Sequence, residues 1–194
     1  MALPKSSGLT ESGASAIQEK EQVDEHTLQV LRSRRVALAR QLAQYGPSGY
    51  YLVVDTARNR LFVKRKDEVV LAATASTGSG TILDKPGQAN AQWVFDTPRG
   101  EFTIQSKLTN PVWVKPDWAY LEEGREVPSD PAERVEAGVL GEYALGFGKG
   151  YFIHGTLYTR LLGKNVTHGC IRLSDDDLKA VYRLAKIGTP IMIF

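Results

Sequence analysis

The stretch Thr-His-Gly-Cys-Ile-Arg-Leu at residues 167–173 contains the only cysteine of the chain, Cys170. In a strand, successive side chains alternate between two faces, so His168, Cys170 and Arg172 are expected to share one face. Ile171 and Leu173 would then point to the other face and join the core. An imidazole, a thiol and a guanidinium on one face favour a chemical role for Cys170 over simple packing.

A second histidine, His154, lies sixteen positions before Cys170 at the end of the stretch Tyr-Phe-Ile-His. A strand next to Cys170 could direct His154 into the same cleft. A thiol attacks as the thiolate, and its unperturbed pKa is about 8.5. An adjacent imidazole can accept its proton, stabilise the resulting ion pair and so prepare acyl transfer.

The neighbours of Cys170 suit the same chemistry. Because Gly169 has no Cβ, the backbone can bend tightly and direct the amide hydrogens of residues 169 and 170 at one point. Two such donors could hold a developing oxyanion. Arg172 could bind a substrate carboxylate through two parallel N–H groups.

Each of these residues also has a structural interpretation. A lone cysteine is often buried and inert. A lone histidine is often a structural residue, which is our interpretation of His26. Arg172 could pair with Asp175 or Asp176.

Two further alternatives stay open from the residues alone. His154, His168 and Cys170 could serve as three ligands of a catalytic zinc, although no clear fourth ligand or zinc spacing is present. The aromatic residues Trp113, Trp118 and Tyr120 could form the wall of a substrate groove or pack beneath a long loop.

The composition indicates a soluble globular protein. Among 194 residues, 42% are hydrophobic and 24% are charged, and the formal net charge of +2 favours neither nucleic acid nor an anionic membrane as a partner. One cysteine cannot form an internal disulfide and does not identify a redox compartment. No apolar run reaches the ~18 residues of a membrane span. The first residues are not an intact secretory signal, and a signal removed or replaced ahead of Met1 is expected.

The first 48 residues are predicted to be a flexible lead (1–16) followed by a helix from Ile17 to Tyr45. The helix has an apolar stripe, predicted to dock on the following domain, that consists of Leu28, Leu31, Leu38, Leu42 and Tyr45. Gly-Pro-Ser-Gly at 46–49 ends the helix.

From residue 49 to the end, the pattern is mostly that of strands separated by short turns. Strands or hairpins are predicted at 50–56, 60–65, 69–77, 97–104, 143–154 and 190–194. Residues 77–90 are predicted to be a loop, and residues 110–140 a long excursion that covers a site. One internal helix is predicted to follow Ser174, its N-cap, and to end before Gly188.

Two motifs together resemble the L,D-transpeptidase (YkuD-type) catalytic domain of bacterial cell-wall enzymes. They are Ile-His-Gly-Thr at 153–156 and Thr-His-Gly-Cys-Ile-Arg-Leu at 167–173. The weaker segments of the resemblance, which runs from Tyr50 to Phe194, lie at 97–102, 110–114, 140–145 and 187–194. The resemblance implies a mainly β, sandwich- or barrel-like domain at 49–194 with one internal helix, preceded by a helical extension at 1–48.

The resemblance also implies roles for site residues. Cys170 would be the acylated nucleophile, and His154 the general base, oriented by the backbone carbonyl of Gly155. His168 would help to shape an oxyanion pocket with the amides of Gly169 and Cys170.

Four further residues are expected to bind substrate: Arg172, Thr167, Trp113 and Tyr143. The excursion at 110–140 corresponds to the variable cover over the family's groove. No metal or cofactor is implied.

The implied reaction joins peptidoglycan stem peptides. The thiolate attacks the bond before the terminal D-Ala of a tetrapeptide stem, D-Ala leaves, and an amine of another stem accepts the acyl group in a 3→3 cross-link. This activity belongs to cell-wall biogenesis and cell shape in the bacterial periplasm or cell envelope, and carbapenems would acylate the same cysteine.

Three alternatives remain. Water as acceptor would make the protein an L,D-carboxypeptidase. An outer-membrane lipoprotein as partner would make it a transferase or hydrolase of that tether. A non-catalytic peptidoglycan-binding module would keep the groove without the chemistry.

Overall fold

The computed structural model describes residues 11–194, with side chains described from residue 25 onward except at residue 43. It divides into a unit that ends at Gly46 and a unit from Pro47 to Phe194. Each unit is described by itself.

The first unit contains one helix, α1 (Glu11–Tyr45). The helix ends before Gly46 and Pro47, as predicted. It begins earlier than the predicted residue 17, because residues 11–16 include alanines and a glutamate that favour helix; the rest of the predicted flexible lead, residues 1–10, lies outside the described residues. The docking of the α1 stripe remains a prediction. Among residues 11–194, no helix combines the length and apolar character needed to cross a membrane.

The second unit contains a five-stranded sheet in the order β3-β2-β1-β15-β7. Its strands are β1 (Tyr50–Asp55), β2 (Arg60–Arg65), β3 (Glu68–Thr74), β7 (Gly100–Thr103) and β15 (Pro190–Ile193). The C-terminal strand β15 pairs in parallel with β1 and antiparallel with β7. It is therefore an inner strand of the sheet, with Ile191 and Ile193 buried.

A second sheet of four strands, in the order β14-β12-β11-β8, positions the chemistry. Its strands are β8 (Ser106–Thr109), β11 (Tyr143–Gly148), β12 (Tyr151–His154) and β14 (Ile171–Arg172). β11 and β12 form the predicted hairpin around Lys149. β12 and β14 run parallel, with His154 opposite Arg172, so the two motifs lie on adjacent strands.

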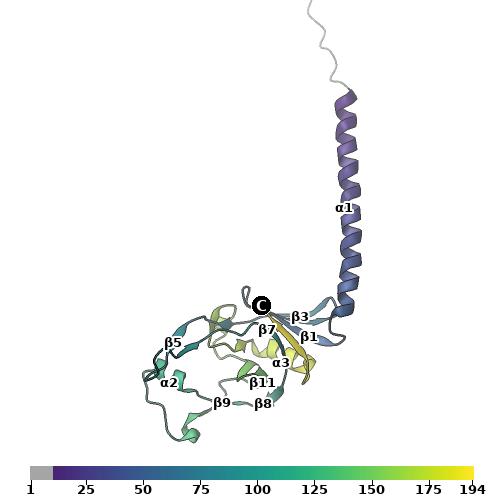
Figure 1. Cartoon of the computed structure of the whole chain (residues 1–194). Helices are drawn as coiled ribbons and strands as arrows, with labels where there is room; N and C mark the ends of the chain where they lie inside the picture. The colour runs from purple at the N-terminus through teal and green to yellow at the C-terminus, as the bar shows by residue number, and fades with distance from the viewer. Residues whose placement is uncertain (1–10) are drawn as a thin grey trace, which may run out of the picture. The chain divides into compact units, whose positions relative to one another are not determined.

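One hydrophobic core joins the two sheets. It contains Leu52 and Val63 from the first sheet and Leu145 and Ile153 from the second. The predicted internal helix is α3 (Asp175–Leu184), which packs against β11 (Figure 1). The side chain of Ser174 caps it by accepting a hydrogen bond from the Asp177 amide. The predicted mainly β fold is confirmed.

The stretch at 167–173 is not one continuous strand, which corrects the prediction. β13 (Asn165–Thr167) ends at the first residue of the stretch and β14 begins at Ile171, and the chain bends between them at Gly169, whose φ is +111°. β13 pairs with β4 (Thr77–Gly78), and a hairpin of β5 (Ile82–Asp84) and β6 (Gln92–Val94) follows, so the predicted loop at 77–90 contains short strands.

The excursion at 110–140, hereafter the cover, has secondary structure of its own. It contains β9 (Val112–Val114), α2 (Asp117–Glu122), a 3₁₀ turn (Pro131–Arg134) and β10 (Val135–Ala137), and β9 pairs with β10. The second internal helix, α2, corrects the prediction of a single one. Its six residues are fewer than two turns, too short for a helical period to be recognised in the sequence.

Candidate active site

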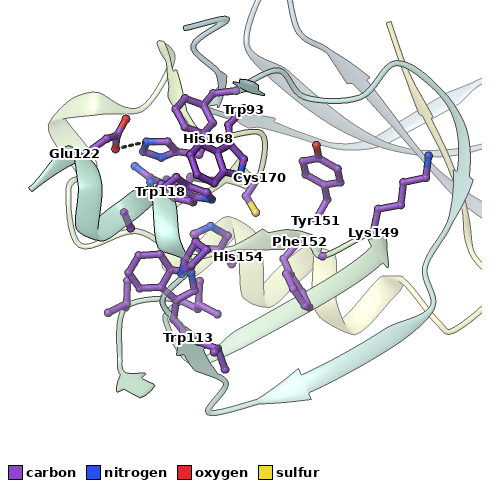
Figure 2. Close-up of a pocket in the computed structure, with 18 of the residues that line it drawn as sticks. Trp93, Trp113, Trp118, Glu122, Lys149, Tyr151, Phe152, His154, His168 and Cys170 are labelled. Atoms are coloured by element: carbon purple, nitrogen blue, oxygen red, sulfur yellow. Dashed lines mark hydrogen bonds and ion pairs between the residues drawn. The ribbon is translucent and has the colours of Figure 1, made fainter. Parts of the chain in front are cut away.

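A cavity of about 660 Å³ brings the two motifs and the cover together (Figure 2). The two motifs contribute His154, His168, Cys170 and Arg172 to its wall. The cover contributes Trp113, Trp118 and Glu122. The bend at Gly169 breaks the predicted strand, but His168, Cys170 and Arg172 still share one cavity. His154 reaches it from β12, as expected.

Cys170 is a free cysteine whose sulfur points into this cavity (Figure 2). The residue is partly exposed, but its thiol is enclosed enough that burial raises the thiol pKa. The backbone N–H of Phe152 and the charge of Arg172 act in the opposite direction with smaller effect. The thiol therefore rests protonated at neutral pH.

His154 is 5% exposed. The pKa of its ring is lowered to about 4, mainly by burial and also by the positive charge of Arg172, while the backbone of Gly155 acts in the opposite direction. The Nδ1 atom is buried and has no hydrogen-bond partner, so the predicted orientation of the ring through the Gly155 carbonyl is not visible as a regular hydrogen bond at that atom. Imidazole and thiol both rest neutral, which differs from the predicted ion pair.

Thr167 supports the loop around Cys170 instead of lining the cavity. Its side chain is buried, donates a hydrogen bond to the Cys170 carbonyl (2.6 Å) and accepts one from the Gly169 N–H (3.2 Å). Thr167 is therefore not a substrate-binding residue in this structure. The Gly169 amide is engaged as well, so the predicted pair of amides directed at one point is not formed.

Thr97 is a residue of the site that the sequence analysis missed. Its hydroxyl donates a hydrogen bond to the Gly169 carbonyl (3.0 Å) and accepts one from the Gly78 N–H (2.8 Å). The carbonyl of Gly169 and the N–H of Cys170 belong to one planar trans peptide and point in opposite directions. Thr97 therefore fixes the direction of the Cys170 N–H. The sequence analysis placed Thr97 at the start of a predicted turn and strand, in a segment of the family resemblance, and gave it no role.

Glycine is required at position 169. A Cβ there would lie 2.5 Å from Cε1 of Tyr151 and 2.7 Å from the backbone oxygen of Asp96, and the positive φ disfavours any other residue. The tight bend that presents Cys170 to the cavity depends on this missing side chain.

The His168 ring contacts the cover. It stacks on Trp118 with ring centroids 4.0 Å apart, and its Nε2 lies 2.8 Å from Oε2 of Glu122. Phe95 meets its edge at 4.5 Å. His168 therefore contacts α2 through Trp118 and Glu122, in addition to the predicted role in an oxyanion pocket.

The remaining predicted substrate-binding residues separate into two groups. Arg172 and Trp113 line the cavity. Among the described residues, Arg172 forms no ion pair, and the alternative partners Asp175 and Asp176 are not used. Tyr143 is not part of the site, because its ring packs against Tyr182 of α3 with centroids 4.5 Å apart.

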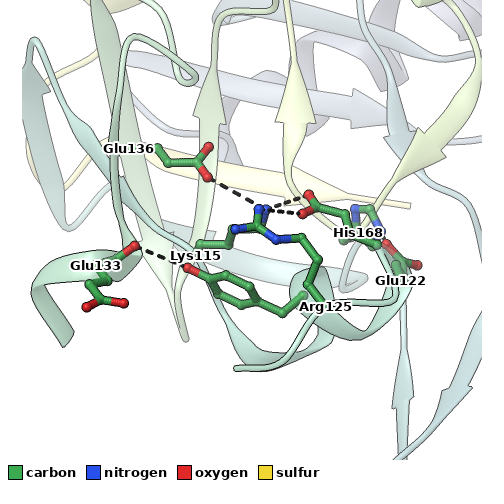
Figure 3. A network of polar contacts seen from close by, with 8 residues as sticks. Lys115, Glu122, Arg125, Glu133, Glu136 and His168 are labelled. Atoms are coloured by element: carbon green, nitrogen blue, oxygen red, sulfur yellow. Dashed lines mark hydrogen bonds and ion pairs between the residues drawn. The ribbon is translucent and has the colours of Figure 1, made fainter. Parts of the chain in front are cut away.

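The cover is held together by its own charges (Figure 3). The buried ammonium group of Lys115 pairs with Glu123 and Glu136 and lies 4.7 Å from the ring centre of Tyr120. Tyr120 is thus part of this packing, whereas Trp113 and Trp118 line the cavity. Arg134 pairs with Asp117 at 2.7 Å.

A zinc site receives no support from the described part of the chain. There, no group of three histidine, cysteine, aspartate or glutamate side chains is arranged to hold a metal ion. The zinc alternative for His154, His168 and Cys170 therefore lacks a ligand cluster.

A two-sheet domain that places a free cysteine and a buried histidine in one covered cavity has the groups that thiol-dependent acyl transfer requires. The family model for the L,D-transpeptidase catalytic domain (YkuD) matches residues 49–193. The chain belongs to this family.

Individual relatives agree with the family model. The chain is 32% identical over 150 residues to the "Probable L,D-transpeptidase ErfK/SrfK" of Salmonella typhimurium, covering 73% of this chain and 46% of the relative. It is 35% identical over 149 residues to the protein of the same name in Escherichia coli K12, covering 73% of this chain and 43% of the relative. The chain thus spans less than half the length of these two proteins.

Solved structures share the fold. The "L,D-transpeptidase from Mycobacterium smegmatis" superimposes with a TM-score of 0.53 and 28% identity, covering 75% of this chain and 58% of that one. An L,D-transpeptidase from Xylanimonas cellulosilytica has a TM-score of 0.56 and 20% identity, with coverages of 77% and 62%.

Proposed function

We propose that this protein is a peptidoglycan L,D-transpeptidase that forms an acyl-enzyme on Cys170. The observation that carries the proposal is the shared cavity of Cys170 and His154 in a domain of this family. The donor is a tetrapeptide stem and the acceptor is the side-chain amine of a second stem. A retained cysteine–histidine pair also argues against a non-catalytic binding module, which has no use for a thiolate.

The acylation step begins with the neutral pair. As the Cys170 sulfur attacks the carbonyl carbon before the terminal D-Ala, its proton passes to His154. His154 suits this role, because its ring lines the same cavity as Cys170 and is neutral at rest, so it can accept a proton. The carbon–nitrogen bond then breaks, the nitrogen of D-Ala takes the proton from His154, and a thioester remains.

The second step reverses these transfers. The acceptor amine attacks the thioester carbonyl, loses its proton to His154 and displaces the sulfur, which recovers the proton. In both steps the negative oxygen needs a donor, and we assign this role to the Cys170 N–H, because the Gly169 N–H is engaged by Thr167.

Arg172 is assigned to substrate binding. Its side chain lines the cavity with no ion-pair partner among the described residues, and its guanidinium suits the carboxylate of the stem peptide. The same positive charge favours the thiolate of Cys170 and disfavours a protonated His154. The first effect favours attack, whereas the second keeps His154 unprotonated at rest but opposes its protonation during the step.

The setting follows from the proposed reaction. Its substrate lies in the bacterial periplasm or cell envelope, where the protein would contribute to cell-wall biogenesis and cell shape. Carbapenems would acylate Cys170. No metal or cofactor takes part in the proposed steps.

The test is mass spectrometry of disaccharide-tetrapeptides incubated with the purified protein and with Cys170→Ala. The expected products are cross-linked dimers that have lost one D-Ala, absent with the variant. Tripeptides alone would identify water as the acceptor and an L,D-carboxypeptidase. Unchanged substrate would overturn transpeptidation between stems. The same experiment would then be repeated with a lipoprotein as acceptor, or with a lipoprotein-linked stem as the substrate for hydrolysis.

A further inference from the structure

Helix α2 of the cover holds His168 with two side chains from one face. Trp118 and Glu122 are four residues apart, a spacing that places them on the same side of a helix. Trp118 stacks on the imidazole ring with an interplanar angle of 21°, and the Glu122 carboxylate lies 2.8 Å from Nε2. Figure 2 shows Trp118 and Glu122 next to His168 at one end of the cavity.

His168 lies two residues before Cys170, in a segment that is itself fixed. Thr97 and Thr167 hold the peptide groups on both sides of Gly169, whose bend tolerates no side chain. A contact to His168 is therefore a contact to a rigid part of the domain.

The cover contributes rigidity from its own side. Lys115 is 3% exposed and pairs with Glu123, the residue that follows α2, and Arg134 pairs with Asp117, the first residue of α2. Both ends of α2 are thus held within the cover. His168 then connects this assembly to the loop that carries the thiol.

The connecting residues also form the wall of the cavity. Trp118, Glu122 and His168 line the same space as Cys170. The position of α2 therefore determines how much room lies above the sulfur.

We propose that Trp118 and Glu122 are positioning residues that hold α2 on His168 and thereby limit the width of the acyl donor that reaches Cys170. An extended peptide stem passes beneath α2, and a bulky planar group does not. The stem as natural donor rests on the proposed function, but the size limit itself depends only on access to the thiol.

The test compares the alkylation of Cys170 by a small and a bulky thiol reagent. Because Cys170 is the only cysteine, labelling by iodoacetamide and by fluorescein maleimide reports on this thiol alone. The variants are Glu122→Ala and Trp118→Ala, with Glu122→Gln as the conservative replacement. The matched control is Glu126→Ala, since Glu126 is an exposed acidic residue of the cover outside the cavity lining.

The expected result is a ratio of maleimide to iodoacetamide rates that rises about fivefold in Glu122→Ala and in Trp118→Ala, as expected for the loss of one partly exposed hydrogen bond or ring contact. Glu122→Gln keeps a hydrogen-bond acceptor and stays nearer the wild-type ratio, and Glu126→Ala does not change it. Circular dichroism confirms that each variant is folded.

Three results would overturn the proposal. The ratio could be the same in all variants, both reagents could accelerate equally, or no variant could become accessible to the maleimide. None of them would bear on transpeptidation, because the measurement needs no peptidoglycan substrate.

Discussion

At the scale of the residue, the site consists of neutral groups that become charged only during the reaction. Burial raises the pKa of Cys170 and lowers that of His154 to about 4, so neither side chain carries a charge at neutral pH. Arg172 supplies a permanent positive charge that acts on both groups. The attack on substrate then needs well-directed donors and acceptors more than a preformed ion pair.

Thr97 offers the sharpest residue-scale prediction. Thr97→Val keeps the shape but removes the hydrogen bonds to the Gly169 carbonyl and from the Gly78 N–H. We expect kcat for cross-linking to fall roughly tenfold to hundredfold with little change in KM, because the Cys170 N–H loses its direction. Steady-state kinetics on tetrapeptide stems measures both constants.

Thr97→Ser is the control, because it retains the hydroxyl and should recover most of kcat. Equal kcat for the valine and serine variants would contradict the role of the hydrogen bond. A rise in KM alone would place Thr97 in substrate binding.

The sequence predicted the residues with chemistry but not those that support them. Cys170 and His154 were recognisable because a thiol and an imidazole stand out at those positions of the two motifs. Thr97 and Thr167 act through buried hydroxyl groups whose partners are backbone atoms brought close only by the fold. Tyr143 was expected to bind substrate within a segment of the family resemblance, but its ring packs against Tyr182 and does not line the cavity.

At the scale of the element, the cover is a folded part of the domain. Its strands β9 and β10 pair, α2 faces the cavity, and Lys115 lies beneath Tyr120 with two carboxylates around it. The ammonium group of Lys115 is buried and pairs with two partly exposed carboxylates, so removing it takes away a contact shared by three segments of the cover.

Lys115→Ala should loosen the cover without unfolding the domain. We expect an arginine-specific protease to cleave after the exposed Arg125 about tenfold faster, since the ion pairs, the contact with Tyr120 and the packing of the side-chain stem are lost together. Lys179→Ala, which removes an exposed lysine of α3, is the control and should not change this rate. Cleavage at the same rate in both variants would mean that Lys115 does not hold the cover.

The elements differed in how well the sequence predicted them. Most strands of the two main sheets and α3 follow a regular apolar period, and α3 has a serine cap, so their positions were predicted, whereas strand β8 was not. Helix α2 is shorter than two turns and is stabilised by ion pairs distant in sequence. The break at Gly169 was missed because alternation alone does not reveal a bend.

At the scale of the whole molecule, the core between the two sheets encloses a titratable group. His154 is neutral in the folded protein down to a pH of about 4, whereas an unfolded chain protonates it near its ordinary pKa of 6.5. Below pH 6.5 the unfolded state therefore binds a proton that the folded state does not. The contribution of neutral His154 to the free energy of unfolding is fully present above pH 6.5 and is lost as the pH falls towards 4.

The prediction concerns the difference between wild type and His154→Gln, a variant that cannot take up this proton. The free energy of unfolding of the wild type, relative to the variant, should fall by about 3 kcal/mol between pH 7 and pH 4. Urea unfolding at a series of pH values measures it. A difference that does not change with pH would mean that His154 titrates alike in the folded and unfolded states.

The central claim is that Cys170 carries the acyl group. The most direct measurement is the intact mass of the protein, quenched within its first turnovers on a tetrapeptide stem whose side-chain amine is acetylated and so cannot accept the acyl group, followed by peptide mapping. We predict an added mass equal to the tetrapeptide without its D-Ala, located on Cys170 and absent from Cys170→Ala. The same adduct on the variant, or continued release of D-Ala by it, would contradict the claim.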